Sequence, residues 1–172
     1  MTIERKRYFV DELKAHYREI ISGAYRAESD AASAAEQIRS EARRKEDAKG
    51  AVEQSRMEAG HRVRRKRAAE ELETLVKFAE RGLRRFAPDA AVDLGALIDV
   101  SIETEEGSDE RTVFLLPVGA GTELTGPGGD GYISVITPAS PVGKALRGAR
   151  SGDSFEIVIR GQDREWTVVD VC

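Results

Sequence analysis

The side chains that could take part in chemistry concentrate in one stretch, residues 39–49, which reads RSEARRKEDAK. Eight of its eleven residues are charged, and it holds no proline, no aromatic and no large apolar residue. Its chemistry would therefore be that of exposed acids and bases. Segments with apolar residues at helical spacing run into this stretch and away from it. We interpret it as the tip of a helical hairpin and expect the function to be decided there.

Reactive groups are scarce in the rest of the chain. Cys172 is the only cysteine, which excludes a disulfide within the chain. The two histidines, His16 and His61, are far apart in the sequence, which argues against a structural zinc site. Residues 88–172 contain no serine–histidine–aspartate set and no glycine-rich loop between a strand and a helix. We therefore predict that the protein is not itself an enzyme and binds no cofactor stably.

Charge divides the chain into two different halves. Residues 1–87 hold 21 lysines and arginines against 16 acids, whereas residues 88–172 hold 6 against 15. Aromatic and β-branched residues in alternation, as in a sheet, lie almost entirely in the second half. Pro88 disfavours helical geometry at the residue before it. We therefore predict a coiled-coil hairpin over 1–87, with its tip near 39–50, and an α+β domain over 88–172.

The first arm of the hairpin shows the seam of a coiled coil. Apolar residues recur at alternating steps of three and four over nine positions, which favours a coiled coil over a plain amphipathic helix. The large side chains come first and alanines follow toward the tip, which allows close approach of two helices. The seam consists of Val10, Leu13, Tyr17, Ile20, Ala24, Ala27, Ala31, Ala34 and Ile38.

The second arm carries a clear seam only near its end. There the seam residues are Leu72, Val76, Ala79, Leu83 and Phe86. Toward the tip the pattern is weaker, with Val52, Ala59 and Val63, and the register slips by about one residue before Ala69. Large residues at the base of both arms and small ones near the tip indicate an antiparallel hairpin.

A basic run, HRVRRKR at 61–67, lies on the second arm. It is interpreted first as a solvated helix face and second as a site that attracts phosphates or an acidic protein surface. No aromatic residue interrupts the run, so stacking on nucleic-acid bases is not expected.

The second half predicts a small, mostly antiparallel sheet with one short helix. Strands are expected over 96–104, 111–118, 132–136, 155–159 and 166–171, with a turn at 105–110 and a tight loop at 125–131. Ser140 is expected to cap a short helix that begins at Pro141 and is stopped by Gly148.

The segment 133–148, ISVITPASPVGKALRG, together with Gly152 and Asp153, resembles the signature of the Gre family (GreA/GreB) of bacterial transcription elongation factors. In that family a Ser-Pro pair starts a short helix and a Gly-Asp turn precedes the last hairpin. The helical hairpin also matches the family in length and position, and strand 114–117 resembles a divergent branch. The resemblance implies that residues 88–172 adopt a fold like that of FK506-binding proteins and dock on RNA polymerase through Ser140 and Pro141.

The resemblance also implies a role for the tip. In cleavage factors of the family, two acids spaced Asp-x-x-Glu help to hold a Mg²⁺ ion shared with the polymerase active site. The family stretch Lys-Glu-Asn-Ala matches 45–48, so the glutamate falls on Glu46. The aspartate position falls on Arg43, which cannot ligate a metal. Asp47 or Glu41 could substitute if the tip is a loop; the alternative is that these are ordinary surface acids at a helix end.

The implied function is that of a bacterial transcription factor that inserts its coiled coil into the polymerase secondary channel. It would modulate elongation or transcript cleavage, with weak or no stimulation of cleavage, and would affect the nascent RNA 3′ end only indirectly. Occlusion of the channel without cleavage stays open. The alternative from another class is a coiled-coil adaptor or structural protein with a different partner. We expect a monomer that contacts no membrane and a cytoplasmic location, because no apolar run suits a signal peptide or a membrane span.

Overall fold

The structure is a computed structural model that describes residues 3–41, 45–104, 107–129 and 131–172; of residues 45–48 it describes the backbone alone. The chain forms two compact units. One consists of Lys14–Glu73, and the other combines Met1–Leu13 with Thr74–Cys172. The domain boundary expected after residue 87 remains a prediction.

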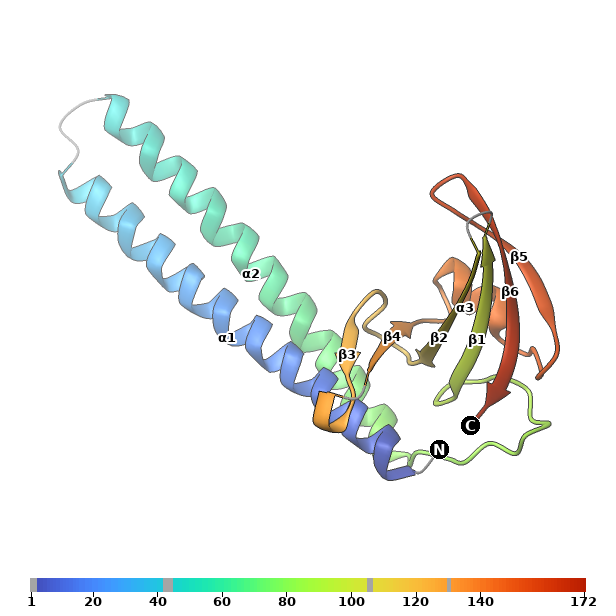
Figure 1. The fold of residues 1–172 in the computed structure, drawn as a ribbon. Helices are drawn as coiled ribbons and strands as arrows, with labels where there is room; N and C mark the ends of the chain where they lie inside the picture. Colours follow the sequence, from blue (N-terminus) through green and yellow to red (C-terminus); the bar gives the residue numbers. More distant parts are fainter. Residues whose placement is uncertain (1–2, 42–44, 105–106, 130) are drawn as a thin grey trace. The chain divides into compact units, whose positions relative to one another are not determined.

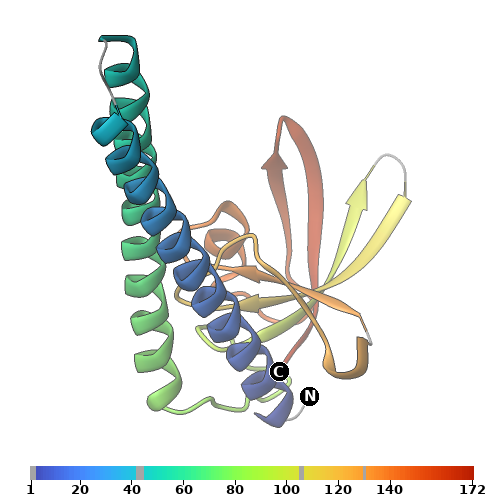
Figure 2. The same cartoon turned by 90° about the vertical axis from the view of Figure 1, so that its left-hand side faces the viewer.

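Two long helices dominate the first half of the chain and confirm the predicted arms. Helix α1 spans Ile3–Glu41 and helix α2 spans Lys45–Glu80. They run antiparallel and lie side by side in both views (Figures 1 and 2). At 1.5 Å per residue each is about 55 Å long. No helix within the described ranges has both the length and the hydrophobicity that crossing a bilayer requires.

The inward face of α1 is the predicted seam. All nine seam residues are buried or half-buried, and Ala35 joins them at 1% exposure. Early in the helix this face carries large side chains such as Leu13 and Tyr17, whereas farther along its fully buried residues are alanines. A buried alanine removes only one methyl group from water, so apolar packing weakens toward the tip.

The inward face of α2 differs from the prediction in its tip half. Val52 and Val63 are 54% and 69% exposed, and Ala59 is exposed as well, so this part of the predicted seam is wrong. The weak apolar pattern misled because most inward positions in this half carry polar side chains. Among the side chains of α2 that the structure describes, the buried ones are Ala51, Ala68 and Leu75, and the half-buried polar residues between them are Gln54, Ser55, Glu58, His61, Arg65 and Glu71.

Helix α2 also ends earlier than the sequence suggested. Its last residue is Glu80, and Gly82 follows with a φ of 89° and an N–H that bonds the Ala79 carbonyl oxygen at 3.0 Å. A glycine in the left-handed region is a common helix stop. Pro88 is therefore not what ends the helix. Leu83 and Phe86 are half-buried but lie outside it.

The second half of the chain forms a six-stranded sheet with the order β3-β4-β2-β1-β6-β5 (Figure 1). The pairing of β2 with β4 is parallel and the other four are antiparallel. The strands are β1 (Leu97–Thr104), β2 (Gly107–Leu115), β3 (Glu123–Thr125), β4 (Tyr132–Ile136), β5 (Ser154–Ile159) and β6 (Gln162–Val171). Helix α3 (Pro141–Leu146) and a 3₁₀ turn, η1 (Pro127–Gly129), complete the α+β fold.

Strand β2 ends at Leu115, before the expected end at residue 118. Three other differences add strand that the sequence did not predict. Strand β2 begins at Gly107, inside the predicted turn, because its first residues pair with β1 from Thr104 backward. Strand β6 begins at Gln162, after a tight turn in which Arg160 and Gly161 both have positive φ. Strand β3 was not predicted. In all three places backbone pairing, not apolar alternation, holds an exposed segment in the sheet.

Both faces of the sheet carry apolar packing. One face forms a core with α3 that includes Ile98, Val100 and Trp166. On the other face, the ring of Phe9 from α1 meets Phe114 edge-on at 6.4 Å between centroids. Gly119, with φ of 92°, permits a close approach there, since a Cβ would lie 2.9 Å from a Leu13 methyl. The start of α1 is thus a structural part of this unit.

Lys6 is an unusual member of the same layer, because it is 1% exposed. Its Nζ donates to the Arg84 carbonyl oxygen at 2.9 Å and lies 4.6 Å from the centroid of the Phe86 ring. Burial, with a smaller contribution from the Arg84 charge, lowers the pKa of Lys6 to about 8, while the Cys172 group opposes the shift. The side chain therefore ties α1 to the segment that follows α2 at an electrostatic cost.

This cost predicts a pH dependence of stability. The folded-state pKa of about 8 lies below the ordinary lysine pKa of 10.5, so the folded protein releases this proton first and gains stability as pH rises between those values. We expect the free energy of unfolding of the parent to rise by about 1–2 kcal/mol relative to Lys6→Met from pH 7 to 9.5. Urea unfolding at both pH values measures this difference. Both proteins should carry Cys172→Ser, and equal pH dependence would contradict the assignment.

Candidate functional site: the hairpin tip and helix α3

The predicted tip lies where α1 ends and α2 begins. Glu41 is the last residue of α1; it is exposed, and its Oε1 accepts a hydrogen bond from Gln37 Nε2 at 3.3 Å. Glu46 and Asp47 occupy successive positions in the first turn of α2, where only the backbone is described. Arg43 lies outside the described residues. The predicted acids therefore come from two helices rather than from one loop.

The helix dipole has opposite effects on the acids at the two helix ends. An acid in the first turn of a helix is favoured by the helix dipole, so helix stability alone would explain Glu46 and Asp47. Glu41 stands at a C-terminal end, where the dipole disfavours a carboxylate. Its position is therefore not accounted for by helix stability. Among the side chains that the structure describes, no group of three or more metal-ligating residues comes together.

Helix α3 is built by Ser140 and Pro141, as predicted. The Ser140 hydroxyl accepts from the Gly143 N–H at 3.1 Å and donates to the Thr137 carbonyl oxygen at 2.7 Å. Pro141 occupies the first turn. Gly143 is required by packing, because a Cβ would lie 1.9 Å from the Thr137 oxygen. The Ser140 hydroxyl is thus engaged in holding the turn.

The outer side of α3 carries Pro141, which the sequence analysis singled out, and two residues that it missed, Lys144 and Arg147. Pro141, Lys144 and Arg147 follow one another at three-residue spacing, and all three are exposed. A spacing of three places helix residues on neighbouring surface positions, which was the available signal. Arg147 lies 3.4 Å from Asp93, whose other carboxylate oxygen accepts from Arg84 at 2.7 Å.

The carboxyl of Asp93 anchors this region. A hydrogen bond from the Leu94 backbone N–H, followed by the Arg84 and Arg147 guanidinium groups, holds its pKa below the ordinary value against the effect of burial. The predicted Gly-Asp turn likewise uses its polar group within the turn itself. Asp153 accepts from the Arg150 N–H at 2.8 Å, and Gly152 has a φ of 91°. The parts of α3 available to a partner are therefore Pro141 and Lys144.

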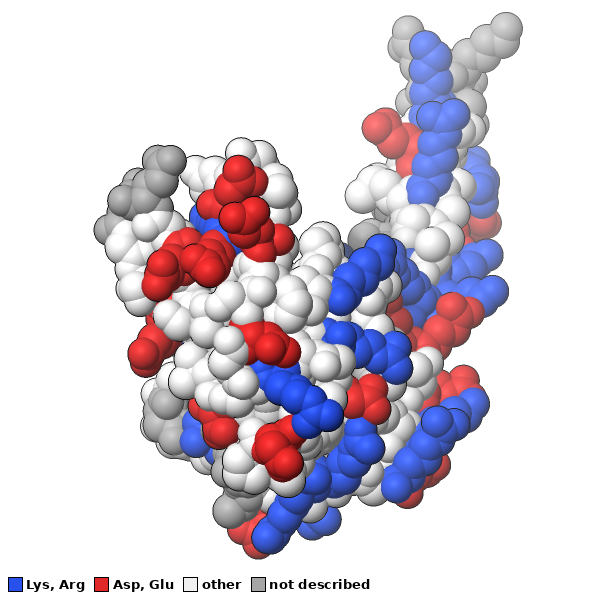
Figure 3. Space-filling model, turned by 90° about the vertical axis from the view of Figure 1, so that its right-hand side faces the viewer, with Lys and Arg blue, Asp and Glu red and all other residues white. Residues whose placement is uncertain are grey.

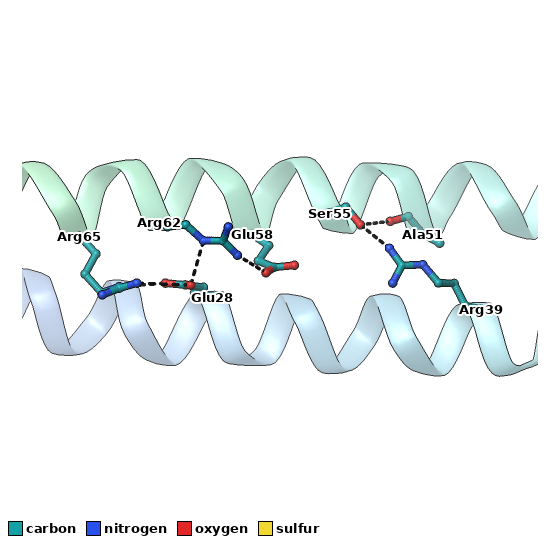
Figure 4. A network of polar contacts seen from close by, with 7 residues as sticks. All are labelled: Glu28, Arg39, Ala51, Ser55, Glu58, Arg62 and Arg65. Atoms are coloured by element: carbon teal, nitrogen blue, oxygen red, sulfur yellow. Dashed lines mark hydrogen bonds and ion pairs between the residues drawn. The ribbon is translucent and has the colours of Figure 1, made fainter.

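The basic run on α2 is mostly exposed, but part of it serves ion pairs. Glu28 of α1 lies between Arg62 and Arg65, with distances of 3.3 Å and 2.9 Å to their Nε atoms (Figure 4). Arg67 pairs with Glu71 one turn along its own helix. Three of the five arginines and lysines of this run thus serve ion pairs, which weakens its interpretation as a site for an acidic partner.

A polar groove of about 750 Å³ lies on the sheet face beside Arg5. Its lining includes Asp99, whose Oδ1 accepts from Thr112 Oγ1 at 2.6 Å, and the Asp109–Arg111 pair at 2.7 Å.

Acidic side chains gather over the sheet unit in Figure 3, whereas Lys and Arg follow the helices. The uneven charge of the two halves is thus visible at the surface.

Comparison with known proteins identifies the family. The model of the C-terminal domain of the GreA/GreB transcription elongation factors matches residues 87–172, which is half of the chain. No curated protein matches the chain.

Similar solved structures include GreA factor homolog 1 (Gfh1) of Thermus thermophilus, at 18% identity and a TM-score of 0.36, covering 91% of this chain and 94% of that one. Gfh1 of Thermus aquaticus has 17% identity and a TM-score of 0.35, covering 91% and 92%. A GreA/GreB factor of Nitrosomonas europaea has 22% identity and a TM-score of 0.34, covering 49% and 63%. On the strength of the family match, this chain belongs to the GreA/GreB family of transcription elongation factors, as a divergent member.

Proposed function

We propose that this transcription factor binds RNA polymerase through residues 88–172 and inserts its helical hairpin into the secondary channel of the enzyme. The observation that carries the proposal is a pair of antiparallel helices, each about 55 Å long, that ends in a densely charged tip. A thin rod of this length reaches into a narrow passage, and its tip then meets the site where the polymerase acts on the RNA 3′ end. The factor acts on the reaction of its partner and has no active site of its own.

The docking contact is assigned to the outer side of α3. Pro141 and Lys144 are exposed on a helix that Ser140 and Gly143 hold rigidly, so they can meet a partner at little cost in ordering. Ser140 supports this surface through its two hydrogen bonds.

The tip is assigned a modulating role with little cleavage stimulation. Carboxylate oxygens of Glu46, Asp47 and Glu41 are the kind of ligand that Mg²⁺ prefers, so the donor set fits an ion shared with the polymerase. That ion would position and activate water for hydrolysis of the RNA. Arg43 stands where the family places the second acid, and its positive charge opposes a cation. Occlusion of the channel is therefore the favoured activity.

The docking assignment predicts a separation of affinity from stability. Pro141→Ala and Lys144→Glu should each weaken binding to core RNA polymerase by about tenfold, the effect of ~1.4 kcal/mol. Neither substitution removes a hydrogen bond that holds α3, so thermal unfolding should stay close to that of the parent. Competition with a labelled GreA or GreB factor measures the affinity.

Ser140→Ala is the matched control for that experiment. It removes the cap of α3 and should cost about 1 kcal/mol of stability, so its binding loss is interpreted only after correction for unfolding. An unchanged affinity for both surface variants would remove α3 from the interface. A failure of the parent protein to compete at all, together with a stable dimer in light scattering, would favour the adaptor alternative.

The tip assignment predicts the effect of restoring the missing acid. With a backtracked polymerase complex, the parent protein should stimulate RNA cleavage little, whereas Arg43→Asp should raise the rate by about tenfold or more, the usual scale for a group that supports a metal ion. Adding Glu46→Ala to Arg43→Asp should abolish the gain, and adding Glu53→Ala, an exposed acid farther along α2, should not. Strong cleavage by the parent would overturn the assignment.

A further inference from the structure

The tip half of the hairpin has little apolar packing to define how its two helices meet. The fully buried residues of this half are Ala31, Ala35 and Ala51. A seam of alanines packs almost equally well after a shift along the helix axes, because each small side chain can be replaced by the next. In this half a polar interaction can define the alignment that the alanines leave open.

That interaction is the cluster around Glu28. Its carboxylate is 15% exposed and receives Arg65 Nε at 2.9 Å on one oxygen and Arg62 Nε at 3.3 Å on the other. Arg62 also reaches Glu58 at 2.7 Å, and the Arg65 guanidinium lies 5.7 Å from the centroid of the Tyr25 ring. The cluster is directional, because both carboxylate oxygens are used and each arginine has a second partner (Figure 4).

A second cross-helix contact nearer the tip keeps the same register. Arg39 Nη2 donates to Ser55 Oγ at 2.8 Å, and Ser55 Oγ donates to the Ala51 carbonyl oxygen at 2.9 Å (Figure 4). Arg39 follows Glu28 by about three helical turns, and Ser55 precedes Arg65 by nearly the same length. Two polar contacts therefore fix the pairing over the half of the hairpin where apolar packing is weakest.

Electrostatics keeps this contact in place at neutral pH. The hydrogen bond from Arg65, and then that from Arg62, holds the pKa of the Glu28 carboxyl below its ordinary value. The carboxylate of Glu28 therefore stays ionised at neutral pH. Charged pairs that flank the seam of a coiled coil set the orientation of the paired helices more than they add stability.

We propose that Glu28, held between Arg62 and Arg65, is a register lock that sets where the hairpin tip stands. A shift by one heptad would displace one helix end by about 10 Å relative to the other, which would separate Glu41 from Glu46. Glu28 is thus a positioning residue for the tip, and this role rests on the proposed action of the tip on RNA polymerase. Two of the five arginines and lysines of the basic run, Arg62 and Arg65, are then explained as half of this lock.

The lock is tested first in the free protein. Nitroxide labels at positions 37 and 53, both exposed, report the distance between the helices near the tip in a Cys172→Ser background. We expect a narrow distance distribution for the parent and a distribution at least about twice as wide for Glu28→Gln. Glu36→Gln is the matched control, because Glu36 is exposed and its ion pair among the described residues is with Arg39 of its own helix, at 3.8 Å. Equal widths for Glu28→Gln and the control would overturn the lock.

The consequence for function is tested with RNA polymerase. Glu28→Gln should keep its affinity in competition, since the docking surface is intact, but should lose most of its effect on elongation at saturating concentration. A loss of about tenfold is expected, because small displacements at a reacting centre have large effects on rate. Arg65→Gln should show the same loss, and the double variant should be no worse than either single one.

The two proposals fail in different ways. A parent protein that neither binds the polymerase nor alters elongation would overturn the proposed function, while the label distances alone would still decide the lock. A broadened distribution combined with an unchanged effect at saturation would overturn the positioning role of Glu28. Additive losses in the double variant would also contradict it, because they would show that Glu28 and Arg65 act separately.

Discussion

The antiparallel pairing of α1 with α2 is the constraint on which the working part of this protein depends. Most of the stability of a helix in a protein comes from packing its apolar stripe against a partner. Here the stripe narrows from large residues such as Leu13 and Tyr17 to alanines. The helices can therefore come close together near the tip, and the rod stays thin there. The same narrowing leaves little apolar contact to define the alignment.

Polar contacts define the alignment of the two helices where alanine packing does not. Glu28 accepts from two arginines of α2, and Arg39 reaches Ser55 on the facing helix. Exposed ion pairs contribute little to stability, so the value of this cluster lies in its geometry. A helical probe needs its end in a fixed place more than it needs extra stability. Direction and register are what a bidentate carboxylate contact provides.

The sheet unit solves a different problem, which is to present a small rigid surface. Helix α3 has only six residues and would not persist alone. Ser140 caps it, Gly143 lets it pack on the preceding turn, and Asp93 ties Arg147 and Arg84 together beside it. The start of α1 belongs to this unit through Phe9 and Lys6. Under the proposed function, docking and probing are thus carried by separately built parts of one chain.

The sequence by itself determined the elements whose signals are local. The 3.5-residue period predicted both arms and the seam of α1, because the periodicity of a helix depends on residues that are close together in the sequence. Ser140 and Pro141 predicted the start of α3 for the same reason, and the Ser-Pro segment indicated the family. The end of α2 at Glu80 also had a local signal in Gly82, but the sequence analysis placed the end of the arm at Pro88.

Only the tertiary structure decided which surfaces meet. The tip half of α2 turns polar residues inward, and that choice depends on Glu28 across the hairpin, which no local pattern in α2 reveals. Strand β3 and the first residues of β2 exist because a neighbouring strand pairs with them. The Ser140 hydroxyl is hydrogen-bonded to Thr137 and Gly143. The proposed docking surface therefore consists of Pro141 and Lys144, and Ser140 only supports it. In each case a contact between distant residues outweighs the local structural preference of the segment. Backbone hydrogen bonds and ion pairs need a partner residue, and the local sequence does not indicate which residue that is.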